Sequence, residues 1–388
     1  MRERPFELQS RDEKILASII DGTSYTEEAQ SRIEYLLLEL KDAIEGGSGG
    51  TTDYSALSNK PKINGETLEG NKTADTLGLA TADNVTTLAD KLTNIDNGGL
   101  SHNSIYRGKD LTEVYTIDEM YDMIHSGNFD DLYLGDYFKK SITTDIYTHF
   151  TGAEFESGTV YYEASGDINN RTWTPTEDAT PQEGKIYATK LTKTENVTLM
   201  FAAFDYYYNM GDTALTTHHA VLIPKTFFAT TAKMNPTNTT AGGYYNSDMH
   251  QITLPCYAKS LKTALGNHLL AHKTWLTTTV NTSTPSMAGA GMTGASSDSA
   301  WETTELQLMN DVQLYGTMVW SSSAYEVGVD NEKLPVFNFI NPVQYGRNYV
   351  WLRSVVSSTH FALCSNNGYA RYYGASSVTF VRPLILFG

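Results

Sequence analysis

The chain has 388 residues, of which 19% are charged, and its formal net charge at pH 7 is −17. Such acidity argues against nucleic-acid binding, which needs clustered Lys and Arg to neutralise phosphates, and against docking on an anionic membrane surface. The two cysteines, Cys256 and Cys364, are too few for a disulfide framework, and we expect buried free thiols rather than a cross-link.

No apolar stretch approaches the roughly 18 to 20 residues that a membrane helix requires. The opening residues also lack the apolar segment of a signal peptide. We therefore expect a protein that is made in the cytoplasm and does not insert into a membrane.

Residues 1–45 have the apolar spacing of an N-terminal helical segment. Four residues in its second half recur with the 4-3-4 spacing of a coiled-coil seam: Ile33, Leu37, Leu40 and Ile44. Two heptads are too few to be stable alone, which favours an oligomer, although a helix packed on its own domain is the alternative.

Residues 46–99 combine a Gly-rich linker, a small β module around the turn Asn64-Gly65, and a further helical stretch. The helical stretch carries a second short seam: Val85, Leu88, Leu92 and Ile95. The β module has too few apolar residues to fold as a monomer. Two seams on either side of it favour a parallel homo-oligomer, and we expect a homotrimer.

Residues 100–388 contain expected helices followed by many short strands and long loops, a pattern typical of a globular α+β domain. We expect a helix that begins after Thr116, with Glu119 completing a capping box, and buried strands at 199–204 and 220–223. Residues 256–272 predict a long helix with Tyr257, Leu261, Leu265 and Leu269 on one face. A shorter helix is expected at 303–314, a strand at 130–137, an exposed loop at 281–299, and a polar β insertion at about 151–197.

Catalytic and metal-binding patterns are weak. His268 and His272 would share one face of the predicted helix, but the Glu that a metalloprotease needs directly after the first His is replaced by Leu269. His218 and His219 would point to opposite faces of a strand. We expect neither enzymatic activity, nor a cofactor, nor a metal site.

The C-terminal stretch consists of two apolar blocks, 348–354 and 380–387, around a polar run. Trp351 and Leu352 are expected to anchor a core, and 384–387 to form a buried strand. The run between them is rich in Tyr, Ser, Asn and Gly, as in antibody binding loops, and we expect it to stay outside the core as a binding face.

Several segments together resemble tail proteins of phages and prophages of Firmicutes. The resemblance lies in Ser10–Leu16 and Tyr54–Gly65, and further on in Gly242–Ser247, Leu265–Leu270, Glu305–Met309, Tyr349–Ser354 and Val381–Pro383. The later segments are similar to prophage receptor-binding domains with the C-type lectin-like fold, as in the major tropism determinant family of retroelement-diversified proteins.

This resemblance implies a trimeric tail fibre or baseplate protein of the virion, made in the host cytoplasm, with a lectin-like domain that binds a glycan or protein receptor on the host cell. It also implies partners among other tail proteins and a C-terminus diversified at AAY codons, which never yield Trp, Lys, Glu, Gln or Met. None of these five types occurs between Ser354 and Thr379. A purely structural tail component and a polysaccharide-degrading tail enzyme are the alternatives.

The expected receptor contacts are polar and aromatic residues of the run: Ser357, Ser358, Thr359, His360, Asn366, Asn367, Tyr369, Arg371, Tyr372 and Tyr373. Trp351, Arg353 and Arg382 are expected to serve as scaffold for this face. The alternative is that the run is an ordinary polar loop.

Overall fold

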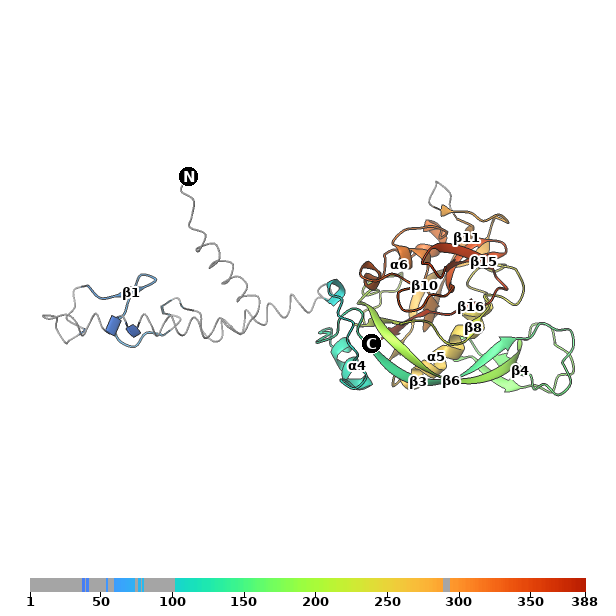
Figure 1. The fold of residues 1–388 in the computed structure, drawn as a ribbon, viewed down its shortest axis with the longest axis horizontal. Coiled ribbons are helices and arrows are strands. Elements are labelled where there is room, and N and C mark those ends of the chain that lie inside the picture. The colour runs from blue at the N-terminus through green and yellow to red at the C-terminus, as the bar shows by residue number, and fades with distance from the viewer. Residues whose placement is uncertain are drawn as a thin grey trace. The chain divides into compact units, whose positions relative to one another are not determined.

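The computed structural model describes residues 37, 38, 40, 41, 54, 59–73, 76, 77, 79, 102–288 and 294–388. These residues belong to two compact units, Met1–Ala89 and Asp90–Gly388. Figure 1 labels some of the helices and strands of both units.

In the first unit a small hairpin joins β1 (Lys62–Ile63) and β2 (Glu66–Thr67) in antiparallel register. Its turn residues Asn64 and Gly65 have φ of 48° and 86°, the left-handed conformation that such a two-residue turn requires and that Asn-Gly readily adopts. The hairpin predicted around this turn is therefore confirmed.

The two predicted seams are only partly described. Six of their residues lie outside the described residues: Ile33, Ile44, Val85, Leu88, Leu92 and Ile95. Leu37 and Leu40 are helical, and Leu37 is 58% exposed, but its neighbour Leu38 is 60% exposed as well. Exposure within one chain thus does not separate a seam position from its neighbour, and the coiled coil and the trimer stay predictions.

The second unit mixes helices with mostly antiparallel sheets, which is compatible with the α+β class. Its largest sheet has eight strands: β3 (Tyr137–His149), β4 (Tyr162–Ser165), β5 (Thr172–Pro175), β6 (Tyr187–Phe204), β7 (Ala220–Pro224), β9 (Leu269–Leu270), β12 (Leu306–Leu308) and β17 (Pro383–Phe387). The path runs β12-β17-β7-β6-β4-β5, with β3 paired to β6 and β9 to β17. The last strand in sequence thus lies inside the sheet.

A second sheet has five strands in the order β15-β14-β13-β16-β8. They are β8 (Thr231–Ala232), β13 (Val350–Ser357), β14 (His360–Cys364), β15 (Ala370–Gly374) and β16 (Thr379–Phe380). A separate hairpin joins β10 (His272–Val280) to β11 (Ser296–Thr304).

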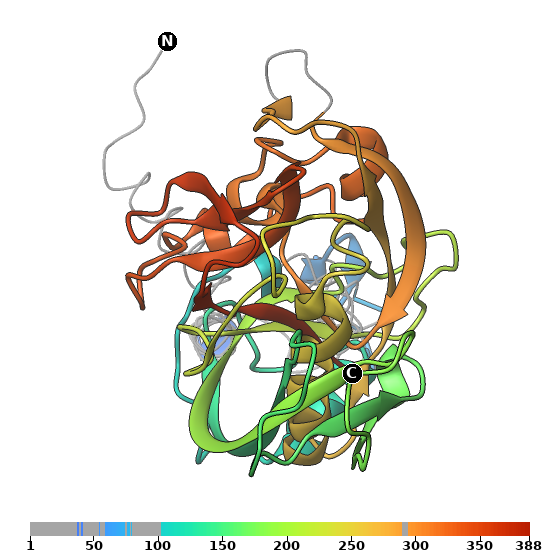
Figure 2. The same cartoon turned by 90° about the vertical axis from the view of Figure 1, so that its right-hand side faces the viewer.

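The helical segments are short. They are η2 (His102–Ser104), α4 (Ile117–His125), η3 (Ile168–Asn170), the π-helical η4 (Met249–Thr253), α5 (Leu254–Ala264), α6 (Asp311–Tyr315), the π-helical η6 (Ser323–Val327) and η7 (Pro335–Asn338). The capping box of Thr116 and Glu119 at α4 is formed as predicted. The ribbon of β3 and β6 curves beside α5 (Figure 2), and the hydroxyls of Thr144 and Ser260 join β3 to α5 at 2.7 Å.

Two helix predictions were wrong in extent. The helix expected over 256–272 ends at Ala264, because Gly266 and Asn267 both adopt φ of 65° and terminate it. Leu269 lies instead in β9, opposite Phe387. The helix expected over 303–314 begins only at Asp311, because the preceding residues, buried on both faces, form β12 inside the large sheet.

The other strand and loop boundaries also shift. The predicted strand 130–137 contributes only Tyr137 to β3, and the predicted loop 281–299 overlaps β11 from Ser296. The insertion is shorter than 151–197, since the register of β3 with β6 is continuous from Tyr137↔Met200 to His149↔Ala188. What remains between these two strands is the β4–β5 hairpin and its loops.

Two hydrophobic cores cover opposite faces of β13 and β14. Trp351, Val355, Phe361 and Leu363 point into one core, whereas Leu352, Val356, Ala362 and Cys364 point into the other. The burial expected for Trp351, Leu352 and the terminal strand is confirmed. The expectation that the run between the apolar blocks stays outside the core was wrong, because four consecutive apolar residues make β14 a strand buried on both faces.

Candidate binding face

Strand β15 lies at the outer edge of the five-stranded sheet, where it pairs only with β14. The turn before it presents Tyr369, which is 69% exposed, and the strand itself exposes Arg371 and Tyr372. Large aromatic side chains are seldom left this open on a soluble domain unless they make contacts elsewhere. Among the residues singled out from the sequence, this edge is therefore the candidate contact surface.

Tyr372 is held in place by two other rings. Its ring meets those of Trp320 and His360 edge-on, both with centroids 5.2 Å apart and planes at 87°. Edge-to-face contacts of this kind are favourable because the positive ring edge meets the negative ring face. Tyr372 thus offers a rigid aromatic surface, with Trp320 buried beneath it.

Two loops lie next to this ring cluster. The backbone N–H of Ser358 donates to the carbonyl of Thr282 at 2.8 Å, and that of Ala288 donates to the carbonyl of Val319 at 2.8 Å. The bonds bring together the neighbours of two exposed methionines, Met287 and Met318. Methionine adapts its shape to many partners and is enriched in protein interfaces.

The sequence interpretation missed Met287, Met318 and Trp320. The available signal was weak: apolar residues in segments otherwise dominated by Ser, Thr, Gly and Ala. We group four exposed side chains under one name, the aromatic–methionine face: Met287 and Met318 from the two loops, Tyr369 from the turn before β15, and Tyr372 from β15 itself.

The polar residues between β13 and β14 mostly bond to one another. His360 Nδ1 lies 2.9 Å from Ser357 Oγ and 2.8 Å from Thr359 Oγ1, and burial lowers the pKa of His360. Ser357 is completely buried, and Thr240 donates to its carbonyl at 2.6 Å. Ser357 therefore supports the turn and does not belong to the exposed surface, whereas Ser358, Thr359 and His360 are partly exposed.

The turn between β14 and β15 is organised by Ser365. Its carbonyl accepts from the N–H of Gly368 at 2.8 Å, and its hydroxyl accepts from the N–H of Tyr369 at 3.0 Å. The turn exposes Asn367 and leaves Asn366 partly exposed. Tyr369 and the two asparagines thus lie together at one end of the edge strand.

Alternation along β15 divides the predicted contacts between two faces. Tyr373 lies opposite Phe361 and Arg371 opposite Leu363, whereas Tyr372 lies opposite Ala362 and points the other way. The Tyr373 ring stacks on Tyr349 with centroids 5.2 Å apart, and a hydrogen bond between their hydroxyls raises the pKa of Tyr373. The predicted contacts therefore do not form one continuous surface.

The three side chains predicted as scaffold are all buried. The indole N–H of Trp351 donates to the carbonyl of Ala232 at 2.9 Å. Arg353 donates to the carboxylate of Asp330 at 2.5 Å, and the same carboxylate accepts from the hydroxyl of Tyr207.

Arg382 is satisfied differently, because its guanidinium donates only to backbone carbonyls, including those of Pro224 at 2.8 Å and Pro342 at 2.7 Å. Burial lowers the pKa of Arg382 to about 10. Carbonyl groups thus hold a buried charge between the two sheets without a carboxylate partner.

Two buried carboxylates shape the loops beneath the face. Asp311 accepts from the backbone N–H groups of Val319 and Ser321 at 2.9 and 3.0 Å, which fixes the loop that carries Met318 and Trp320. Glu326 accepts from the N–H of Val355 at 2.7 Å, and burial raises its pKa to about 7. The face is thus mounted on a rigid polar support.

The histidine pairs do not form metal sites. His268 follows α5 and stacks on Tyr121 at 3.7 Å, whereas His272 is buried in β10, so the two do not share a helix face. Among the described residues no three His, Cys, Asp or Glu side chains are grouped to hold a metal. Cys256 and Cys364 are buried free thiols, as predicted.

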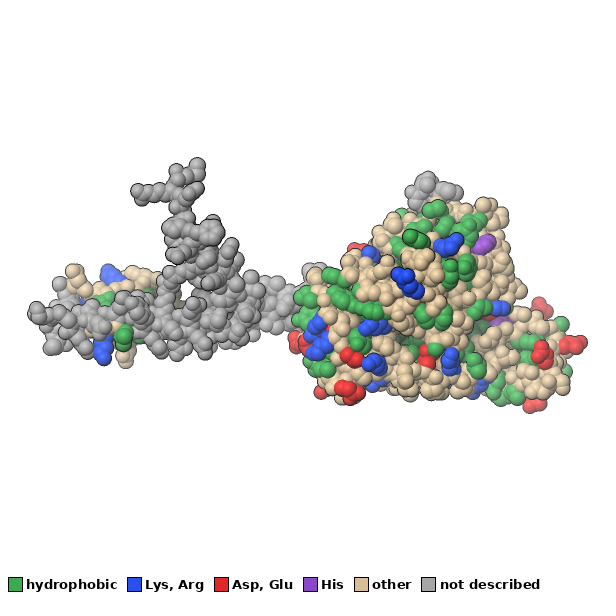
Figure 3. Space-filling view, in the orientation of Figure 1, with side chains coloured by type: hydrophobic (Ala, Val, Ile, Leu, Met, Phe, Trp, Pro, Cys, Tyr) green, Lys and Arg blue, Asp and Glu red, His purple; other side chains and the backbone are tan. Residues whose placement is uncertain are grey.

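Acidic residues are unevenly distributed over the surface of the second unit. In Figure 3 red side chains gather near α4 and around the β4 hairpin, and few occur near β11 and β15. The region of β11 and β15 thus shows few acidic side chains in this view, although the protein is strongly acidic.

The sequence matches no protein family model. Comparisons with curated proteins and with solved structures also return no match. No helix within the described ranges has both the length and the apolar character needed to cross a bilayer.

Proposed function

We propose that this chain is a receptor-binding protein of a phage tail fibre or baseplate, with a C-type lectin-like C-terminal unit. In this proposal it attaches the virion to a host cell-surface glycan or protein. The single observation that carries the proposal is the aromatic–methionine face: exposed, mostly uncharged, and mounted on a fully buried scaffold.

The chemistry of the face supports recognition rather than catalysis. Tyr contributes broad contact area at a low cost in side-chain entropy, and the rings around Tyr372 reduce that cost further. Asn367, in the same turn as Tyr369, adds an exposed hydrogen-bond donor. The residues beneath the face, among them Asp311, Glu326 and Arg353, form buried hydrogen bonds with one another's segments and not with the exposed side chains. Substitutions of the exposed side chains should therefore leave the core unchanged.

The N-terminal seams support a display in three copies. Weak contacts at each tip gain greatly when they are linked, because the later binding events become intramolecular. Light scattering tests this part directly: a mass about three times the 42.9 kDa of one chain is expected, and a monomer at micromolar concentration contradicts the trimer.

Cell binding tests the proposed face. The fluorescently labelled full chain and its Tyr369→Ala/Tyr372→Ala variant are compared by flow cytometry on strains of the bacterium that carries the gene. We expect the variant to lose at least about tenfold in binding, as for central aromatic anchors. Val160→Ala, at an apolar side chain on the insertion that is 61% exposed, is the control and should bind normally.

Two outcomes contradict the proposal. Unchanged cell binding by the double variant, with normal particle assembly, indicates a structural tail component. Release of soluble sugars from host envelope polysaccharide by the purified protein indicates a degrading enzyme.

A further inference from the structure

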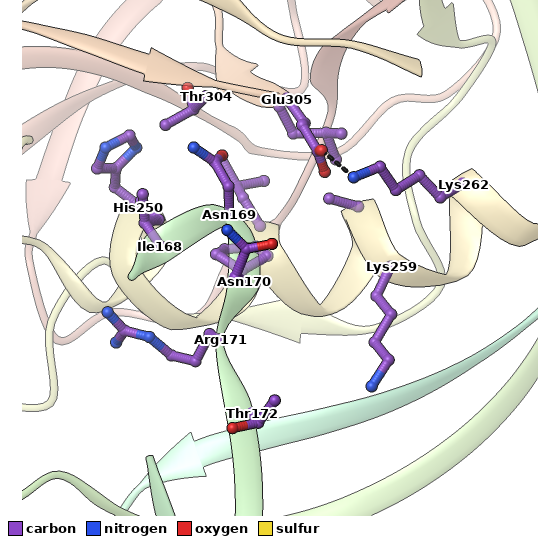
Figure 4. Close-up of a pocket in the computed structure, with 14 residues that line it drawn as sticks. Ile168, Asn169, Asn170, Arg171, Thr172, His250, Lys259, Lys262, Thr304 and Glu305 are labelled. Atoms are coloured by element: carbon purple, nitrogen blue, oxygen red, sulfur yellow. Dashed lines mark ion pairs between the residues drawn. The ribbon is translucent and has the colours of Figure 1, made fainter. Parts of the chain in front are cut away.

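A pocket of about 240 Å³ lies between the insertion and the side of α5 (Figure 4), and no residue of the aromatic–methionine face lines it. Its walls are the η3 loop, the outer face of α5, and the junction of β11 and β12. A second pocket of about 450 Å³ adjoins it and shares Arg171, Thr172, Pro255 and Lys259. Together they form one groove, which we call the insertion groove.

Arg171 is a cation without a carboxylate partner in this groove. Its Nη2 donates to Gln251 Oε1 at 3.3 Å, a long contact, and its buried Nε and Nη1 make no hydrogen bond to any described residue. Burial lowers the pKa of Arg171. An unpaired buried guanidinium is costly, so an arginine in this state favours an anionic ligand.

The acidic groups nearby are already engaged. Asp167 accepts from the backbone N–H groups of Asn169 and Asn170 at 3.0 and 2.9 Å. Asp145 pairs with Lys190 at 2.8 Å, and Glu305 pairs with Lys262.

Lys259 on α5 is exposed and forms no ion pair with a described residue. Figure 4 shows Arg171 and Lys259 reaching from the η3 loop and from α5, respectively. Neither cation forms an ion pair with a described carboxylate, although the charge of Asp167 acts on Arg171 and that of Asp145 lies near Lys259. The concave site thus keeps two cations without direct partners in a protein whose net charge is −17.

His250 adds a buried polar group that also lacks a partner. Its side chain is almost completely buried against the pocket, and neither ring nitrogen bonds to a described residue. Burial, together with the charges of Arg353 and Arg171, lowers its pKa to about 3, so the ring is neutral at pH 7. A neutral imidazole can donate from one nitrogen and accept at the other.

The adjoining pocket supplies an aromatic wall. Trp173 stacks on Tyr147 with ring centroids 4.6 Å apart and planes at 7°, and both rings line this pocket with the hydroxyl residues Thr143 and Thr172. Flat aromatic surfaces beside hydroxyl groups suit the apolar face and the hydroxyls of a sugar ring.

We propose that the insertion groove binds a sugar that carries a phosphate or carboxylate group. Arg171 holds the anionic group, Lys259 adds positive charge at the border between the two pockets, and the ring lies along Trp173. Because Gln251 holds the guanidinium through one long bond, the Arg171 side chain can turn to present Nε and Nη1 to the anion in the bidentate geometry that arginine favours. This site is independent of the aromatic–methionine face.

Calorimetric titration of the full chain tests the site with glucose 6-phosphate, glucuronate, inorganic phosphate and glucose. We expect the two anionic sugars to bind at least about tenfold more tightly than glucose, since a charge-assisted contact is lost with the neutral sugar. Tight binding of only one of them identifies the anionic group. Equal affinity for glucose and both anionic sugars, or binding of none of them, overturns the proposal.

Variants assign the roles. Arg171→Gln and Lys259→Gln should each weaken binding of the anionic sugar about tenfold, whereas Arg347→Gln, the same charge change on an exposed arginine elsewhere, should not. Trp173→Ala should weaken binding of the anionic sugar but leave that of inorganic phosphate unchanged. Because Lys259 is exposed, its substitution should not disturb folding. Weaker binding by Lys259→Gln therefore cannot be explained by misfolding, as it could for Arg171→Gln.

Thermal unfolding separates binding from a structural role. Removing an unpaired buried charge should leave the melting temperature of the free Arg171→Gln protein unchanged or higher, while its shift on adding the anionic sugar disappears. A lower melting temperature together with unchanged affinity shows that Arg171 is structural and overturns the assignment.

Discussion

Strands β14 and β15 are hydrogen-bonded neighbours, but one is buried on both faces and the other is an exposed edge strand. β14 is covered on both faces by the two cores, whereas β15 has a free outer edge and exposed side chains. Five residue pairs join them, from His360↔Gly374 to Cys364↔Ala370. A single hydrogen-bonded ladder thus holds an exposed edge strand in place on a strand that is packed on both faces.

The cores hold the position of β15 without depending on its side chains. At Tyr372 the ladder partner is Ala362, a small buried residue that leaves the aromatic ring its place against Trp320. If the two strands have these different roles, substitutions in the cores that cover β14 should lower the free energy of unfolding, whereas substitutions on β15 should weaken host-cell binding.

The largest effect is expected below the sheet, at the buried pair of Arg353 and Asp330. Arg353→Met leaves the Asp330 carboxylate buried without its cation, so the free energy of unfolding should fall by about 3 to 5 kcal/mol. Urea denaturation measures this, with Arg371→Met on β15 as control. Equal losses of unfolding free energy in the two variants would show that the buried and the exposed arginine do not differ in their contribution to stability.

The next effect is a pH dependence caused by Glu326, which holds β13 through Val355. Its folded pKa of about 7 lies above the ordinary value of 4.5, so the folded state binds more protons between these values. Its contribution to stability is therefore present at pH 5 and lost as the pH rises through 7, by on the order of 2 to 3 kcal/mol.

Comparison with Glu326→Gln isolates that contribution. The difference in unfolding free energy between the wild-type protein and the variant should become less favourable to the wild type from pH 5 to pH 8. A difference that stays constant, or that changes with the opposite sign, contradicts the role of Glu326.

Within β15 a smaller difference is expected between the two faces. Tyr373→Ala removes a ring that stacks on Tyr349 and should lower the unfolding free energy by about 1 kcal/mol. Host-cell binding by this variant should stay closer to normal than that of Tyr372→Ala. The reverse order of cell binding would place the recognition surface on the Tyr349 side.

The smallest stability change is expected at Tyr369. Because this ring is largely exposed, Tyr369→Ala should change the unfolding free energy by less than about 0.5 kcal/mol. Cell binding should nevertheless fall. A stability loss comparable to that of Tyr373→Ala would show that Tyr369 supports the turn.

Local signals in the sequence predicted part of this arrangement. The capping box at Thr116, the Asn64-Gly65 turn and the apolar strands β7, β13 and β17 follow from residue types within a few positions. The predicted extent of α5 was wrong. The apolar spacing continues through Leu269, but Gly266 and Asn267 adopt left-handed φ and end the helix before it. The spacing of apolar residues does not show where residues with left-handed φ end a helix.

The candidate face could be predicted only in outline. Composition pointed to Tyr369 and Tyr372, and both are exposed, but it also included Ser357, which hydrogen bonds from a distant segment bury. Met287, Met318 and Trp320 join the face through contacts between loops far apart in the chain. The insertion groove is likewise formed by residues from the insertion, α5 and the β11–β12 junction, so it has no local sequence pattern.

The position of β17 has a consequence for biosynthesis. It is the last strand of the large sheet along the chain, yet β7, β9 and β12 all pair with it. On the ribosome the hairpin of β3 and β6 can form early, but the strands that await β17 keep unpaired edges open to other nascent chains. Folding of the second unit therefore cannot be completed before β17 has emerged from the ribosome, and a product truncated before Pro383 would keep those edges exposed.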